Sequence, residues 1–207
     1  GSEEAVAVNG TIRSQYSGFD GAPTTYFFNV HAPVRLLGYQ HGVGLGIVSD
    51  AAGLENKTGI KGSYAFRKSA GNGMLGIGLN LGFENYAFKF GDAVSVTSSE
   101  FPTDEQKTIS FTAGLGAFYT TDNLFLGVSV SNINRPKIKY EKQPSYKKPH
   151  LYCTFGYNYQ LANPLYELRP SMMIESDVAS TQLNLTGLVY YNNRIWGGLN
   201  YRTTDAV

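Results

Sequence analysis

The stretch that decides the fold runs from Thr108 to Asn132, TISFTAGLGAFYTTDNLFLGVSVSN. It contains two alternating runs joined by a polar turn at residues 121–123. Side chains of a β-strand alternate between two faces, so each run puts apolar residues on one face and small or hydroxylated residues on the other. Phe118 and Phe125, beside the turn, are the exceptions. A hairpin with hydrocarbon on one side and a polar space on the other is typical of a membrane-spanning β-barrel.

The composition favours strands and argues against nucleic acid as a partner. The 207 residues include 24 Gly and 15 Tyr, only 16% are charged, and the net charge is +1. Phosphate binding needs a concentrated basic surface, which this balance does not supply. Cys153 is the single cysteine, so no intramolecular disulfide forms. No run approaches 18 apolar residues, which argues against a transmembrane helix, and a barrel strand escapes that test because only alternate residues meet lipid.

The same alternation continues along the chain and predicts eleven strands. The clearest example places Leu75, Ile77, Leu79, Leu81 and Phe83 opposite glycines, an asparagine and a glutamate. The pair Asn192-Asn193 favours a hairpin turn, because asparagine readily adopts positive φ. Besides the two opening runs, the predicted strands are residues 4–16, 25–34, 42–49, 58–67, 75–84, 150–159, 165–176, 181–191 and 194–202.

The connections alternate in length. The two longest, residues 85–107 and 132–148, both follow odd-numbered strands, and residues 17–24 and 50–57 also form predicted loops on that side. Outer-membrane barrels have long loops on one side and short turns on the other. We therefore predict an all-β, antiparallel transmembrane β-barrel of the outer membrane, with residues 1–207 as a single domain. Because such barrels have even strand counts, we expect about 12 to 14 strands in the complete protein and a chain truncated at both ends.

Several charged residues share the polar parity of their strands. Mixed signs leave two interpretations open: these side chains line a selective pore, or they pair across a filled lumen. The predicted lumen-facing residues are Arg13, Lys61, Arg67, Glu84, Glu167, Arg169, Glu175 and Arg202.

No catalytic, cofactor or metal site is predicted, and we expect a protein that is not an enzyme. His31, His41 and His150 lack the spacing of metal ligands, and no GxSxG motif surrounds a serine. The glycines of residues 42–46 do not lead into a helix, so they do not form a phosphate-binding loop. A barrel lipase with Ser and His on neighbouring strands is the remaining enzymatic alternative.

Two segments are candidate partner-binding sites. In the first, a buried Arg13 beside a Phe-Asp-Gly turn indicates a fixed structure folded against the barrel; a plain turn is the alternative. The second is a basic loop, which is either solvated surface or a docking patch for an acidic partner. The predicted contact residues are Gly18, Phe19, Asp20, Gly21, Ala22 and Pro23 in the first, and Lys137, Lys139 and Lys142, near Lys147 and Lys148, in the second.

Three stretches carry a family resemblance: RSQYSGFDGAPTTYFFNVHAPV (13–34), GVGLGIVSDAAGLENKTGIKGSYAFR (42–67) and WGGLNYRTTDAV (196–207). Together they resemble the PorP/SprF family of outer-membrane proteins of the type IX secretion system, whose members run longer. The resemblance implies a non-enzymatic role in protein export across the outer membrane, linked to surface adhesins and gliding motility. It also implies contact with outer-membrane lipid, secreted cargo, and periplasmic or peptidoglycan-associated secretion components.

The alternation by itself leaves two other functions open. One is a passive porin or small-molecule transporter of the outer membrane, and the other is a soluble all-β binding protein. Conductance in a planar bilayer distinguishes the first, and solubility without detergent distinguishes the second.

Overall fold

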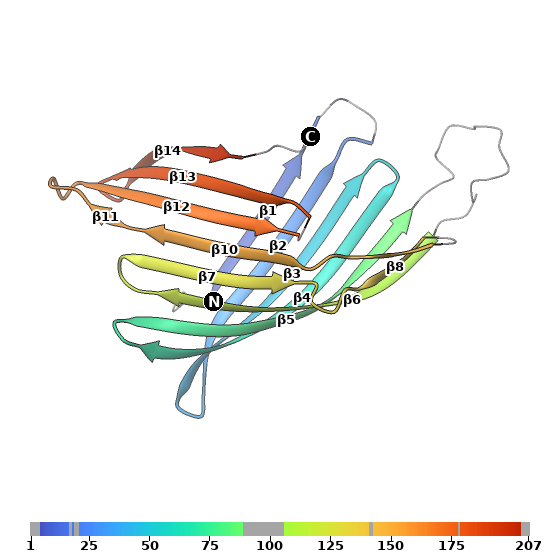
Figure 1. The fold of residues 1–207 in the computed structure, drawn as a ribbon, viewed down its shortest axis with the longest axis horizontal. Coiled ribbons are helices and arrows are strands. Elements are labelled where there is room, and N and C mark those ends of the chain that lie inside the picture. Colours follow the sequence, from blue (N-terminus) through green and yellow to red (C-terminus); the bar gives the residue numbers. More distant parts are fainter. Residues whose placement is uncertain are drawn as a thin grey trace. The chain divides into compact units, whose positions relative to one another are not determined.

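The structure is a computed structural model that describes residues 5–16, 18, 21–88, 106–140, 143–177 and 179–203. In these ranges the regular elements are β-strands (Figure 1). No helix within them has the length and apolar character needed to cross a membrane.

Antiparallel strands form one large sheet among the described residues, in the order β1-β2-β3-β4-β5-β6-β7-β10-β12-β13-β14, with β11 beside β12. The strands β8 and β9 form a separate two-stranded sheet. This confirms the all-β, antiparallel prediction; closure of the sheet into a barrel stays a prediction. The bounds are β1 Ala7–Ser14, β2 Thr24–Leu36, β3 Tyr39–Ala52, β4 Glu55–Ala70, β5 Gly73–Phe88, β6 Gln106–Thr120, β7 Leu124–Ser131, β8 Lys137–Tyr140, β9 Gln143–Tyr146, β10 His150–Tyr157, β11 Tyr159–Gln160, β12 Tyr166–Ser176, β13 Thr181–Tyr191 and β14 Ile195–Arg202.

The chain folds as two compact units: Gly1–Ala65, Asn80–Ala113 and Asn134–Lys147 form the first, and Phe66–Leu79, Gly114–Ile133 and Lys148–Val207 form the second. In the first, β2 and β3 pair along their whole length, from Leu36↔Tyr39 to Thr24↔Ala51. At the far end of this hairpin, the amide of Gly53 donates to the carbonyl of Gly21 over 3.0 Å. Gly21 (φ 77°) and Gly53 (φ 58°) adopt conformations that favour glycine.

The hairpin predicted over residues 108–132 forms as β6 and β7. The strands β6 and β7 pair from Leu115↔Val130 to Thr120↔Phe125. The strand β13 has the predicted bounds, and it pairs with β14 through a turn in which Asn192 and Asn193 have φ of 50° and 51°. The positive φ predicted for this asparagine pair is therefore confirmed.

The two faces of β5 follow the predicted alternation. Ile77, Leu79, Leu81 and Phe83 are 41–57% exposed, whereas Gly82, Glu84 and Tyr86, on the other parity, are buried. Many strands repeat this pattern of exposed large apolar side chains, among them Ile12, Leu45, Phe111, Leu126 and Val189. The apolar face is thus left uncovered by the described residues, and the polar face is the packed one.

Several predicted boundaries are wrong. Residues 50–57 are not a loop, because β3 runs to Ala52 and β4 begins at Glu55; the Thr25 hydroxyl donates to Asp50 over 2.7 Å and holds this polar stretch in the sheet. The long loop predicted at 132–148 contains β8 and β9. The strand predicted over 150–159 is interrupted at Asn158. Residues 85–88, predicted as the start of a long connection, belong to β5, which runs to Phe88, and residues 89–105 lie outside the described ranges.

Candidate functional site

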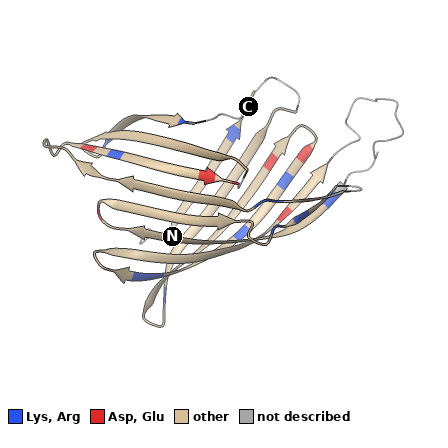
Figure 2. Ribbon diagram, in the orientation of Figure 1, with Lys and Arg blue, Asp and Glu red and all other residues tan. Residues whose placement is uncertain are grey.

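Charge is sparse on the strands, and most of their length carries neither Lys, Arg, Asp nor Glu (Figure 2). The densest group of ion pairs in the described part of the chain lies in the first unit, around Glu84. This carboxylate is 3% exposed, on the polar face of β5. We refer to Lys57, Lys61, Glu84, Tyr86 and Lys147 as the Glu84 cluster.

Three ammonium groups share the single carboxylate of the Glu84 cluster. Lys147 Nζ donates to Glu84 Oε2 over 2.5 Å. Lys57 and Lys61, from β4, place their Nζ atoms 3.6 and 3.8 Å from Oε1. An isolated buried carboxylate is costly to desolvate, so these cations are what makes an ionised Glu84 tolerable inside the fold. Burial lowers the pKa of the Lys147 ammonium, and the hydrogen bond to Glu84 opposes that shift.

Tyr86 completes the cluster on the same face of β5. Its hydroxyl donates to Glu84 Oε2 over 2.7 Å, and its ring lies 5.1 Å from Lys147 Nζ and 5.8 Å from Lys57 Nζ. An aromatic face attracts cations at this distance, so the phenol stabilises both the carboxylate and its ammonium partners.

Glycines allow the strands around the cluster to approach closely. A Cβ on Gly82 would lie 2.6 Å from the carbonyl oxygen of Ile60 and 2.6 Å from Lys61 Cγ. A Cβ on Gly59 would lie 3.3 Å from Glu84 Cγ. The glycines that alternate with apolar residues in these strands therefore bring the lysine stems of β4 against the polar face of β5.

Lys147 belongs to a segment that lies across β6 and reaches β5. We call residues 134–140 and 143–147, which include the hairpin of β8 and β9, the strap. The side-chain amide of Asn134 donates to the carbonyl of Phe111 over 2.7 Å and accepts from the amide of Ala113 over 3.0 Å. The Ser110 hydroxyl then donates to the carbonyl of Lys137 over 2.8 Å. Asn134 thus takes the place of a neighbouring strand for part of the β6 edge.

The strap lies on the polar face of β5 and β6. Ser110 and Glu84, its contacts, share the parity opposite to the exposed Phe111 and Phe83. Ile138 of the strap is 6% exposed, and the amide of Lys147 donates to the carbonyl of Pro136 over 3.0 Å, which closes the base of the hairpin. The Glu84 cluster is therefore the point where Lys147, at the end of the strap, is fastened to β5.

The predicted lumen-facing residues fall into separate groups. Lys61 and Glu84 meet in the Glu84 cluster of the first unit. In the second unit, Arg169 Nε donates to Glu167 over 2.8 Å, its guanidinium lies 3.8 Å from the centre of the Tyr190 ring, and Glu175 lies 3.8 Å from His150. Arg202 donates to Asn184 over 2.8 Å and Arg67 is buried. That these side chains face a lumen stays a prediction.

The first partner-binding segment is described only in part. Arg13 is exposed, so the expectation of a buried arginine there is wrong. Gly18, with φ 117°, and the carbonyl of Gly21, which accepts from Gly53, show a turn, and the amide of Gln15 donates to the carbonyl of Pro23 over 2.9 Å. Phe19 and Asp20 lie outside the described residues; Ala22 and Pro23 are half-buried.

The predicted basic loop is divided between different environments. Lys137 is exposed, and Lys148 is exposed and 3.7 Å from Asp177. Lys147 is instead held by Glu84, so it is not solvated surface. The Lys139 side chain and Lys142 lie outside the described residues. Glu84 is buried on the polar parity of β5, as the alternation predicts, but the sequence carries no signal for its partner, because Lys147 lies 63 residues along the chain.

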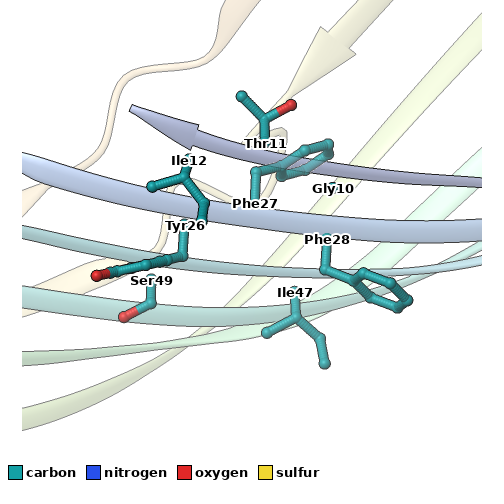
Figure 3. Close-up of a pocket in the computed structure, with 8 residues that line it drawn as sticks. All are labelled: Gly10, Thr11, Ile12, Tyr26, Phe27, Phe28, Ile47 and Ser49. Atoms are coloured by element: carbon teal, nitrogen blue, oxygen red, sulfur yellow. The ribbon is translucent and has the colours of Figure 1, made fainter. Parts of the chain in front are cut away.

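A shallow hollow on the first unit has the wrong chemistry for catalysis. It encloses about 420 Å³ and is lined mainly by apolar side chains of β1, β2 and β3. Phe27 and Phe28 point to opposite sides of β2, and Gly10 leaves the space beside Phe28 open (Figure 3). Within the described ranges, no group of three or more His, Cys, Asp or Glu has a geometry that could hold a metal ion.

Strands with an exposed apolar face and a packed, ion-paired polar face define the class: a β-rich membrane protein. The chain belongs to the PorP/SprF family, because the family model described as "Type IX secretion system membrane protein PorP/SprF" matches residues 1–207. The family is a membrane component of a secretion system and is not a known enzyme family. No curated protein and no solved structure matches the chain.

Proposed function

We propose that this protein is a non-enzymatic outer-membrane β-barrel component of the type IX secretion system. In this role residues 1–207 belong to a single barrel domain that supports the export or surface attachment of secreted proteins, such as gliding adhesins. The partners are outer-membrane lipid, the secreted cargo, and other secretion components, including periplasmic or peptidoglycan-associated proteins.

The observation that carries this proposal is the inverted exposure of the two faces of β5. Its large apolar side chains are exposed, and its carboxylate is buried among three lysines. In water this arrangement would leave a wide apolar surface exposed, whereas a bilayer solvates that surface and leaves the polar face to the interior. Family membership supplies the link to secretion.

The cargo is held or received rather than conducted, because the polar face is already occupied. Charged side chains and the strap cover part of it in the first unit. A barrel of about 12 to 14 strands has only a modest interior, which leaves little room for a folded protein to pass.

Two measurements test the proposal. Cell fractionation should recover the protein with outer membranes after high-salt and carbonate washes, and recovery in the soluble fraction would refute the membrane assignment. Deleting the gene should remove a subset of proteins from the cell surface while outer-membrane assembly stays normal. An unchanged set of surface proteins would refute the export role.

A further inference from the structure

The strap is fastened to the sheet by two attachments of different chemistry. Its first leg, residues 134–140, is held to β6 by neutral hydrogen bonds: Asn134 bonds to Phe111 and Ala113, and Ser110 donates to the carbonyl of Lys137. Its second leg, residues 143–147, pairs with the first leg through β8 and β9 and is held to β5 at Lys147 by an ion pair with the buried Glu84. The neutral bonds do not depend on a charged group, whereas the ion pair depends on a single carboxylate.

The Glu84–Lys147 ion pair lies beside two further ammonium groups. Three ammonium groups lie within 4 Å of one carboxylate, so Lys147 competes with Lys57 and Lys61 for it. If Glu84 lost its charge, the three cations would repel one another in a partly buried space. The second leg, which belongs to a short hairpin, is the element free to move away from the two β4 lysines.

We propose that the strap is a latched lid over the polar face of β5 and β6, and that the Glu84–Lys147 pair is its latch. Release of the latch leaves the first leg attached through Asn134 and through the bond from Ser110 to Lys137, and lets the second leg move away from β5. The lid then uncovers the polar interior of the barrel. This inference rests on the proposed barrel, and its test is chosen so that the two can fail separately.

Tyr146 offers a direct readout of the latch, since it precedes Lys147 and its side chain is 59% exposed. Chymotrypsin cleaves after tyrosine only where the backbone can leave the sheet, so the cleavage rate reports local opening. We expect slow cleavage in the wild-type protein in outer-membrane vesicles. Glu84→Gln and Lys147→Met should each raise the rate about tenfold or more, because each removes the charged contact that holds the second leg.

Glu167→Gln is the matched control. It also removes a carboxylate from the polar parity of a strand and breaks a short pair, with Arg169, in the second unit. Cleavage at Tyr146 should stay at the wild-type rate. Lys147→Met keeps the inference testable if Glu84→Gln fails to assemble, because it leaves the buried carboxylate paired with Lys57 and Lys61.

The second readout is the uptake of a pentose sugar by liposomes that contain the full-length protein. Both latch variants should admit the sugar faster than the wild type and the Glu167→Gln control. Wild-type cleavage rates in both latch variants would overturn the latch, and fast cleavage without faster uptake would overturn the lid. A wild-type protein that does not insert into liposomes would instead overturn the barrel assignment, whatever the cleavage rates are.

Discussion

The two faces of β5 follow opposite rules. On one, Ile77, Leu79, Leu81 and Phe83 are exposed, although burial of such side chains normally stabilises a fold. On the other, Glu84 is 3% exposed, although a carboxylate normally stays in water. Adjacent residues of one strand therefore meet two environments, and neither is the one a soluble sheet would give them.

This contrast shows where each face obtains its stability. The apolar face gains little from the described protein residues, so its favourable solvent must come from outside the chain. The polar face gains from close packing at glycines and from ion pairs within the protein. Substitutions on the two faces should therefore destabilise the protein for different reasons.

The largest expected effect comes from placing a charge on the apolar face. Leu79→Arg should destabilise the folded protein by about 2–4 kcal/mol in a bilayer, the cost of an arginine facing lipid near the midplane. Urea titration of folding into phospholipid vesicles measures it. Asn72→Arg, in the β4–β5 turn, should be nearly neutral. A change within about 0.5 kcal/mol for Leu79→Arg, as on a soluble surface, would show that this face meets water.

On the polar face, the next effect is steric. Gly82→Ala puts a methyl group 2.6 Å from the carbonyl oxygen of Ile60, a backbone atom that cannot rotate away. We expect a loss of about 1–3 kcal/mol from overpacking, by the same titration. Gly62→Ala, on β4, is the control, because its Cβ would meet its nearest atom at an ordinary 3.9 Å. Equal stability of the two variants would mean that β4 and β5 do not pack as closely as described.

The hydroxyl of Tyr86 should have a smaller effect. Tyr86→Phe removes the 2.7 Å hydrogen bond to Glu84 but keeps the ring beside Lys57 and Lys147. Three lysines remain to pair the carboxylate, so we expect a loss of about 1 kcal/mol. Tyr119→Phe, which removes a bond to the carbonyl of Ala70, is the neutral counterpart and should cost less. If Tyr119→Phe lost more stability than Tyr86→Phe, the charged Glu84 acceptor would not be what strengthens the Tyr86 hydrogen bond.

The sequence predicts the apolar face of β5 much better than it predicts the contacts on the polar face. Alternation is a local pattern, so the apolar face of β5, the β6–β7 hairpin and the bounds of β13 followed from it. The strap did not, because β8 and β9 are four residues each and carry lysines and a proline rather than an apolar stripe. The contact from Lys147 to Glu84 spans 63 residues, and no period in the sequence encodes it.

The ends of some strands also could not be predicted from the local sequence pattern. The sequence from Asp50 to Lys57 is polar and reads as a loop, yet it is mostly strand. Pairing with Thr24 and Thr25 of β2 extends β3 past the end of its apolar alternation. The polar rim of the sheet is therefore set by neighbouring strands, which a single sequence does not reveal.

The smallest expected effect on stability concerns Asp177, a carboxylate in a turn, in contrast to the buried Glu84 of β5. In the β12–β13 turn, the backbone amide of Ser180 donates to Asp177 over 2.7 Å. This bond, with the Ser180 hydroxyl, the Ala179 amide and nearby Lys148, lowers the pKa of Asp177 from its ordinary 3.8 to about 2. A depressed carboxyl pKa stabilises the folded protein above the unfolded value and loses that contribution as the pH falls from about 4 towards 2. The wild type should therefore melt slightly higher than Asp177→Asn at pH 5, and the difference should vanish near pH 2. A difference for Asp177→Asn that persists at pH 2 would mean that its carboxylate charge is not the cause.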